Sequence, residues 1–207
     1  MNPCDVLIEG AWLIDGSGSE RQRTDIAIAG DRIAGVGDGR HWQPKTRIDA
    51  RDRVIAPGFV DAHTHDDRAV LSSPDMTPKI SQGVTTVVAG NCGLSLAPLA
   101  DRDPPPPLNL LGNREWYRFP TFDSYAEIVE AQPPALNIAM LVGHSTLRVG
   151  VMDDLARAAT PAEIDRMGKL LEQSLAAGCI GMSTGLAYPT AQAAPTEEVI
   201  ALAERLV

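Results

Sequence analysis

Short hydrophobic segments separated by glycine-containing turns fill the first 55 residues of the chain. The segments lie at 6–8, 11–14, 26–28, 33–36 and 47–49. Segments of this length between turn residues are typical of antiparallel β-strands, and no helical periodicity is present among them. Because so few residues cannot cover both faces of a sheet, the pattern predicts a small β-module that packs against something else.

From Gly58 onward, the pattern changes to buried strands that alternate with helices. Continuous apolar or β-branched runs, typical of buried parallel strands, lead up to His63 and recur at 84–89, 138–142 and 180–184. Capping residues and glycine stops predict helices at 77–82, 124–131 and 161–177, and another from 197. The proline-rich segment 98–120 predicts an inserted loop. Four strand–helix units predict a parallel sheet with right-handed crossovers.

Pro57 and Gly58 separate the two patterns, so we expect a β-module at 1–57 and a strand–helix domain at 58–207. The length of 207 residues fits a doubly wound sheet slightly better than an eight-stranded barrel, which takes about 250 residues. The glycine fingerprint of a dinucleotide-binding fold and a Walker-type loop are both missing from the sequence. The order of elements alone therefore leaves both architectures open.

Composition and charge exclude several classes of partner. The net charge of -9 argues against nucleic acid or an anionic membrane, and the 4% aromatic content removes the stacking surfaces of single-strand binders. No signal peptide or run as long as a membrane span is visible, so we expect a cytoplasmic protein. The three cysteines are far apart and odd in number, which makes a disulfide framework a poor interpretation.

The polar residues of interest lie where predicted strands stop. His63 and His65 are two apart, and side chains two apart on a strand share one face, so both can reach one metal ion. Cys92 follows the next strand, which is expected to be a neighbour, and a His-His-Cys cluster results. The alternatives are a core and a surface histidine, and an inert buried Cys92 thiol. His144 and Ser183 end the third and fourth strands.

Several motifs together carry a resemblance to a known family. The segment 57–65 resembles the metal-binding opening of the amidohydrolase superfamily. Four segments resemble one branch of this superfamily, the N-acyl-D-amino-acid deacylases (D-aminoacylases): 63–67, 90–93, 143–148 and 183–188. The resemblance covers the whole chain, and the cysteine loop at 90–93 is its most specific part. It implies an α/β fold, the first half of a metal-dependent (β/α)8 TIM barrel, preceded by a small β-sandwich module built from both chain ends.

The resemblance also implies the chemistry. Cys92 is implied as a ligand of one tightly bound Zn2+, and His63 and His65 as ligands of a second, weaker metal position. Tyr188 is implied to contact the substrate carboxylate, and we also expect His144 and Ser183 in the substrate pocket. The implied reaction is zinc-dependent hydrolysis of small-molecule N-acyl-D-amino acids to a carboxylate and a D-amino acid.

Two further zinc histidines and the base aspartate of the family are expected beyond residue 207, so none of the catalytic set is expected here. The chain is accordingly predicted to be an inactive N-terminal fragment that self-associates through an unpaired barrel edge. Two alternatives stay open. One is an amidohydrolase that acts on cyclic amides or deaminates its substrate, which would not need Cys92. The other is a non-catalytic metal-binding or association module.

Overall fold

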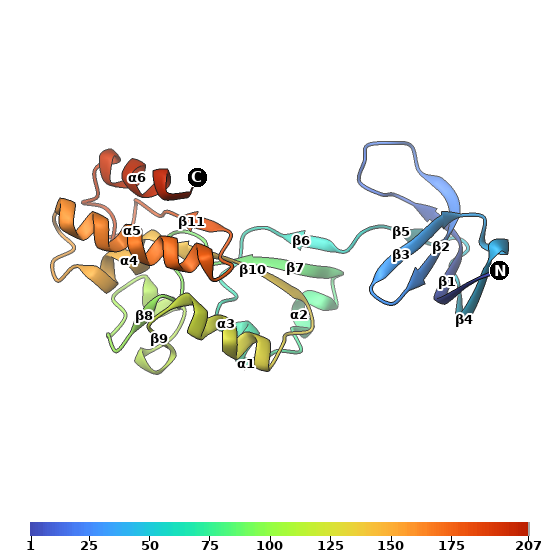
Figure 1. Ribbon diagram of the computed structural model, residues 1–207, viewed down its shortest axis with the longest axis horizontal. Helices are drawn as coiled ribbons and strands as arrows, with labels where there is room; N and C mark the ends of the chain where they lie inside the picture. Colours follow the sequence, from blue (N-terminus) through green and yellow to red (C-terminus); the bar gives the residue numbers. More distant parts are fainter. Residues whose placement is uncertain (207) are drawn as a thin grey trace. The chain divides into compact units, whose positions relative to one another are not determined.

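The computed structural model describes residues 1–206, which divide into two compact units (Figure 1). The first unit is Met1–Gly58, and the second begins at Phe59. No helix in the described part of the chain is long and apolar enough to cross a membrane.

The first unit is a five-stranded sheet in which β1 is central. Its strands are β1 (Asn2–Leu13), β2 (Gln22–Ala29), β3 (Arg32–Gly37), β4 (Trp42–Asp49) and β5 (Val54–Ile55), with a short 3-10 helix at Gly39–His41. The order is β3-β2-β1-β4, and β5 also pairs with β1. β1–β2 and β2–β3 are antiparallel as predicted, but β4 and β5 run parallel to β1. Turn residues between successive strands predict hairpins. They do not predict the pairing of β4 with β1, because β4 crosses to the other edge of the sheet.

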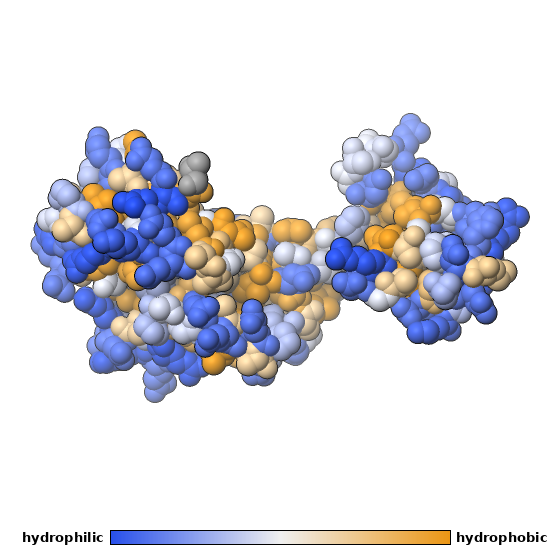
Figure 2. All heavy atoms as spheres, viewed as in Figure 1, coloured by the Kyte–Doolittle hydropathy of each residue, from blue (hydrophilic) through white to orange (hydrophobic). Residues whose placement is uncertain are grey.

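This unit has a small core and an uncovered apolar face. Cys4, Leu7 and Ala27 form its buried cluster. Ile33 and Val36 are 68% and 51% exposed, and with neighbouring apolar residues they line a hollow of about 540 Å³ (Figure 2). The few buried residues agree with the expectation that the module cannot complete a core by itself.

The second unit is built on a four-stranded parallel sheet in the order β11-β10-β7-β6. Its strands are β6 (Phe59–Asp61), β7 (Val84–Ala89), β10 (Asn137–Gly143) and β11 (Gly181–Ser183). Its helices are α1 (Ala69–Ser72), α2 (Thr77–Ile80), α3 (Phe122–Ala131), α4 (His144–Val151), α5 (Pro161–Ala176) and α6 (Thr196–Ala203). Neighbouring strands follow chain order without a reversal. This order is that of a barrel, because a doubly wound sheet reverses at a switch point.

The long proline-rich loop is closed by its own small ribbon. β8 (Leu99–Ala100) pairs antiparallel with β9 (Arg118–Phe119), and 3-10 turns at Leu108–Leu110 and Arg114–Trp116 lie between them. Tyr117, which is buried, donates its hydroxyl hydrogen bond to the Leu108 carbonyl at 2.6 Å. The prediction of a segment without long helices or strands is confirmed.

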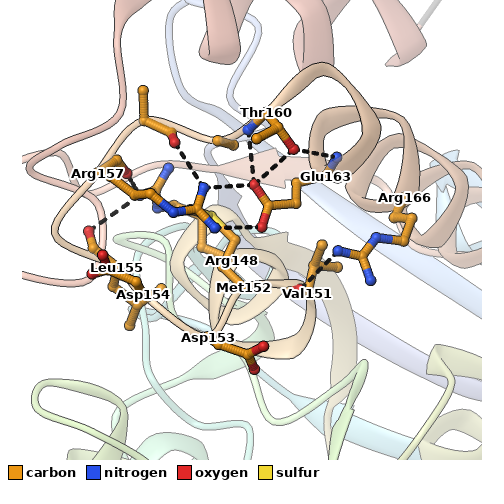
Figure 3. Close-up of polar contacts among 12 residues, drawn as sticks. Arg148, Val151, Met152, Asp153, Asp154, Leu155, Arg157, Thr160, Glu163 and Arg166 are labelled. Atoms are coloured by element: carbon orange, nitrogen blue, oxygen red, sulfur yellow. Dashed lines mark hydrogen bonds and ion pairs between the residues drawn. The ribbon is translucent and has the colours of Figure 1, made fainter.

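The helix that begins after Thr160 has the capping box that the sequence predicted (Figure 3). The Thr160 side chain accepts a hydrogen bond from the Glu163 N–H, and the Glu163 carboxylate accepts one from the Thr160 N–H. Arg157 donates to both Glu163 carboxylate oxygens at 2.7 Å. These hydrogen bonds hold the pKa of Glu163 well below its usual range, with Arg157 as the main cause. The start of α5 is therefore fixed by local sequence.

Helix α4 was not predicted, and His144 is its first residue rather than a free strand end. Nearly every side chain of α4 is buried, and the buried residues include polar His144, Ser145, Thr146 and Arg148, so no solvent-facing polar side marks the helix. Arg148, fully buried in α4, donates to the carbonyl oxygens of Arg157 at 2.8 Å and of Leu155 at 3.3 Å (Figure 3). It also donates to the Thr190 carbonyl oxygen at 2.8 Å. A buried guanidinium is tolerated at this position because acceptors lie in its plane, where its N–H groups point.

Glu198 of α6 neutralises Arg148 inside the unit. Its Oε1 lies 2.5 Å from Arg148 Nη1 and 2.9 Å from His144 Nε2, and all three side chains are fully buried. Burial raises the pKa of Glu198, but hydrogen bonds from His144 and Arg148 outweigh burial and lower that pKa to about 2. This network ties α4 to α6 across 50 residues of sequence.

Replacing Glu198 by glutamine should lower the free energy of unfolding by about 3–5 kcal/mol, because Arg148 keeps its charge without a buried partner. Urea titration measures this loss. Glu197→Gln, at an exposed position of the same helix, is the control and should change stability by less than about 0.5 kcal/mol.

The same pair of variants carries a pH test. The pKa of Glu198 is lower in the folded than in the unfolded protein, so its contribution is complete above about pH 4.5 and is lost as pH falls toward 2. The stability gap between wild type and Glu198→Gln should therefore narrow over that range. A gap that is constant from pH 7 to 3 would contradict the assignment.

Candidate metal centre

The loop that follows β7 carries Cys92 in an unusual backbone conformation. Gly90, Cys92 and Gly93 have φ values of 79°, 55° and 77°. Glycine adopts such angles freely, but a cysteine in the left-handed region is uncommon and persists only where its surroundings hold it there. The backbone conformation of this loop therefore depends on contacts with the surrounding protein.

Three glycines let this loop approach neighbouring backbone more closely than any side chain would permit. A Cβ added at Gly90 would lie 1.9 Å from the Leu141 carbonyl oxygen. A Cβ at Gly143 would lie 2.3 Å from the Gly93 oxygen, and one at Gly185 would lie 2.2 Å from the Cys92 oxygen. The Cys92 loop is thus packed directly on the end of β10 and on the segment after β11.

His63, His65 and Cys92 come together at this end of the sheet. Their ligand atoms lie within 4.8 Å of one another, and His63 Nε2 is 3.0 Å from Cys92 Sγ. Within residues 1–206 they are the one such cluster that could hold a metal ion. Both histidines are exposed and Cys92 is half-buried, so the cluster is open to solvent.

The strand argument for the two histidines was wrong in its detail. β6 ends at Asp61, so His63 and His65 lie in the following loop and not on the strand. Their rings stand edge to face with centroids 6.0 Å apart. The loop is held by Thr64, whose N–H and hydroxyl both donate to the Val88 carbonyl of β7, at 3.0 and 2.9 Å.

The donor set fits zinc. Imidazole nitrogen and thiolate sulfur are the usual zinc ligands, and two ligand atoms of one tetrahedral ion lie about 3.5 Å apart at ordinary bond lengths. The spacing of the three side chains brackets that value. Partial burial and the neighbouring His63 lower the pKa of His65, while Asp66 opposes them. A lowered pKa favours the neutral imidazole that metal binding requires.

Three acidic residues, Asp61, Asp66 and Asp67, flank the two histidines in the sequence. Lys79 of α2 has its ammonium nitrogen 2.7 Å from Asp61 Oδ2 and 3.1 Å from Asp66 Oδ2. The hydrogen bond to Lys79 lowers the pKa of Asp61. Asp67 is fully buried, and burial raises its pKa to about 7. The short motifs of the sequence give no sign of these contacts, because Lys79 approaches Asp61 and Asp66 only through the fold.

The residues predicted to contact substrate lie in three different environments. Tyr188 is half-buried in the loop after β11. Ser183 is half-buried, and its hydroxyl is hydrogen-bonded to Gly90 and Gly93 of the Cys92 loop. His144 is fully buried against Glu198 and exposes no atom with which to touch a substrate. The cluster of His63, His65 and Cys92 is thus brought together, Ser183 supports it, and His144 is kept apart from solvent.

A family model described as "Amidohydrolase family" matches residues 46–207. The chain belongs to this family. A D-aminoacylase of Alcaligenes xylosoxydans xylosoxydans is 54% identical over 198 residues, which are 96% of this chain and 41% of that protein. An N-acyl-D-glutamate deacylase of the same organism is 42% identical, with 96% of this chain and 41% of that protein covered. The chain therefore spans about two fifths of the length of these amidohydrolase relatives.

Solved structures agree with this membership. A crystal structure of D-aminoacylase superposes with a TM-score of 0.96 at 51% identity over 99% of this chain and 43% of its own. N-acyl-D-glutamate deacylase from Bordetella bronchiseptica, complexed with zinc and a phosphonate inhibitor, has a TM-score of 0.90 at 41% identity, with the same coverage. The predicted fold, part of an amidohydrolase barrel with a small β-module, is confirmed, as is the resemblance to the deacylase branch.

Gly143→Ala should disturb the site by steric contact alone, because Gly143 has an ordinary φ of -78°. Its new Cβ would press on the Gly93 oxygen, so we expect a loss of about 1–3 kcal/mol in stability and a lower metal content. Urea unfolding and metal analysis measure the two effects.

The matched control is Gly150→Ala in helix α4, which begins directly after Gly143; there the nearest atoms would be 3.7 Å from the new Cβ. Alanine there should leave metal content unchanged and should raise stability by up to about 1 kcal/mol. Equal effects of the two substitutions would show that the close approach at Gly143 does not matter.

Proposed function

We propose that this chain is the barrel-opening part of a zinc-dependent deacylase that hydrolyses N-acyl-D-amino acids to a carboxylate and a D-amino acid. The observation that carries the proposal is the cluster of His63, His65 and Cys92 beyond the carboxyl ends of adjacent parallel strands. Barrel enzymes keep their chemistry at that end of the sheet. The family membership and the deacylase relatives give the reaction class.

In this proposal Cys92 holds one zinc ion tightly, and His63 and His65 serve a second, weaker position. Zinc supplies Lewis-acid polarisation of the amide carbonyl and activation of water for attack. Cys92 is fixed by its loop, so its thiolate is presented without a rearrangement. A D-aminoacylase relative is described as having a binuclear metal centre, which supports two positions.

The remaining zinc ligands and the base aspartate would come from a part of the protein outside this chain. The sheet supports this division, because β6 is an edge strand and its Phe59 and Val60 are 62% and 60% exposed. An unpaired apolar edge attracts another strand. We therefore propose that residues 1–207 alone are inactive and self-associate, and that in the whole protein the edge is covered by further barrel.

The function is tested with the whole protein through Cys92→Ala. Loss of the thiolate should lower the zinc content and abolish hydrolysis of N-acetyl-D-amino acids, measured by metal analysis and by release of free amine. Cys179→Ala is the control, because the Cys179 thiol is buried and donates to carbonyl oxygens of Met140 and Gly181. Hydrolysis of N-acetyl-L-amino acids or of cyclic amides at equal rates would contradict the proposed substrate class.

Tyr188 is proposed to bind the substrate carboxylate from the loop after β11. Tyr188→Phe should lower kcat/KM mainly through a higher KM, because a hydrogen bond to a charged group contributes about 1.5–3 kcal/mol. The matched control is Tyr117→Phe, whose hydroxyl donates to a buried carbonyl. That variant should lose stability with KM unchanged. An unchanged KM for Tyr188→Phe would assign Tyr188 to packing.

A further inference from the structure

One hydroxyl group holds the Cys92 loop on both sides of the cysteine. The Ser183 hydroxyl donates to the Gly90 carbonyl oxygen at 2.5 Å and accepts from the Gly93 N–H at 2.9 Å. Ser183 belongs to β11, 90 residues beyond Gly93 in the sequence. Because both hydrogen-bonding capacities of the hydroxyl are used within the protein, Ser183 is committed to the loop.

A buried carboxylate holds the same loop from the histidine side. Asp67 Oδ2 accepts from the Gly90 N–H at 3.1 Å, and Asp67 Oδ1 accepts from the Leu96 N–H at 3.3 Å. Both carboxylate oxygens therefore act as acceptors, and an amide in this place would turn an N–H against one of the two donors. Asp67 is two residues from His65, so it links the two segments that carry the metal ligands.

Gly90 is fixed at both of its polar groups, the N–H by Asp67 and the carbonyl by Ser183. The loop itself contributes a backbone hydrogen bond from the Leu94 N–H to the Asn91 carbonyl. Cys92 lies between these attachment points in the left-handed region, which costs about 1–3 kcal/mol and needs support from outside the loop. The support on each side of Cys92 comes from side chains of other segments.

We infer that Asp67 and Ser183 are positioning residues that hold the Cys92 thiol at the metal position. We call this pair, with its hydrogen bonds to Gly90, Gly93 and Leu96, the Cys92 clamp. The inference rests on the proposed metal centre and deepens it: the clamp hydrogen-bonds to the backbone of the loop and to none of the candidate ligand side chains. Its loss should therefore weaken metal binding through sulfur, and this effect is separable from KM.

The experiment uses the whole protein with cobalt(II) in place of zinc, because a thiolate ligand produces a charge-transfer absorption band with cobalt. Chelator competition gives the cobalt affinity. In the metal-free protein, the alkylation rate of the peptide that contains Cys92 reports how firmly its thiol is held; the other two cysteines of this chain, Cys4 and Cys179, are buried. The variants are Ser183→Ala and Asp67→Asn, with Ser183→Thr to restore a hydroxyl.

The clamp predicts that Ser183→Ala and Asp67→Asn bind cobalt roughly 10–100-fold more weakly, with a weaker sulfur band and faster alkylation. Ser183→Thr should regain most of the affinity. Ser174→Ala is the matched control, because the buried Ser174 hydroxyl donates only to a carbonyl of its own helix α5. It should bind cobalt like the wild type.

The clamp would be overturned if Ser183→Ala kept the cobalt affinity, the sulfur band and the Cys92 alkylation rate of the wild type. It would also be overturned if Ser174→Ala lost as much cobalt affinity as Ser183→Ala. If Asp67→Asn does not fold, the variants of the half-buried Ser183 test the clamp without it. Cys92→Ala separates the two levels of the proposal. If Cys92→Ala removes the sulfur band while Ser183→Ala leaves it intact, only the clamp fails; if Cys92→Ala changes nothing, the metal centre fails with it.

Discussion

The second unit depends on backbone packed against backbone around the Cys92 loop. Gly90, Gly143 and Gly185 remove the side chains that would separate this loop from β10 and from the segment after β11. The loop can then be shared by three neighbouring strand ends, and its polar groups must be satisfied by what surrounds them. Ser95 shows how closely they are matched: its N–H donates to Thr146 of α4, and the Thr146 hydroxyl donates back to the Ser95 carbonyl. The conformation of the loop is therefore maintained by contacts within the protein, without a metal.

A second constraint, the buried charge of Arg148, organises the outer side of the same unit. Its guanidinium joins carbonyl groups of two loops and the carboxylate of Glu198, so α4, α6 and the loops around Leu155 and Thr190 form one hydrogen-bonded body. Thr190 in turn donates to Ser145, one helical turn before Arg148. The loop that carries Tyr188 is therefore attached at Thr190 to a helix whose first turn contacts the Cys92 loop. Helix α4 therefore contacts both the Cys92 loop and the loop that carries Tyr188.

The sequence predicted those parts whose causes are local. β7 and β10 follow from apolar runs, and α5 follows from the Thr160–Glu163 capping box, because neighbouring residues decide both. The pairing of β4 with β1 and the existence of α4 have causes elsewhere in the chain. α4 follows Gly143, which offers no side-chain cap, and its polar residues are buried by the rest of the fold, so neither a cap nor a solvent-facing polar side marks it in the sequence. Likewise, His63, His65 and Cys92 were predicted together, whereas the contacts of Asp67 depend on a fold that no short motif encodes.

The way in which His63, His65 and Cys92 are held indicates what kind of metal site they could form. A structural zinc site is closed by four protein ligands and buried by the fold it stabilises. Here the cysteine is half-buried and rigidly held, while His63 and His65 lie exposed on a loop that hydrogen-bonds chiefly through Thr64. The second unit has its own hydrophobic core, whose members range from Val70 to Leu202. A cluster built from constrained backbone at the carboxyl ends of parallel strands lies where barrel enzymes keep their chemistry, which agrees with the function proposed above.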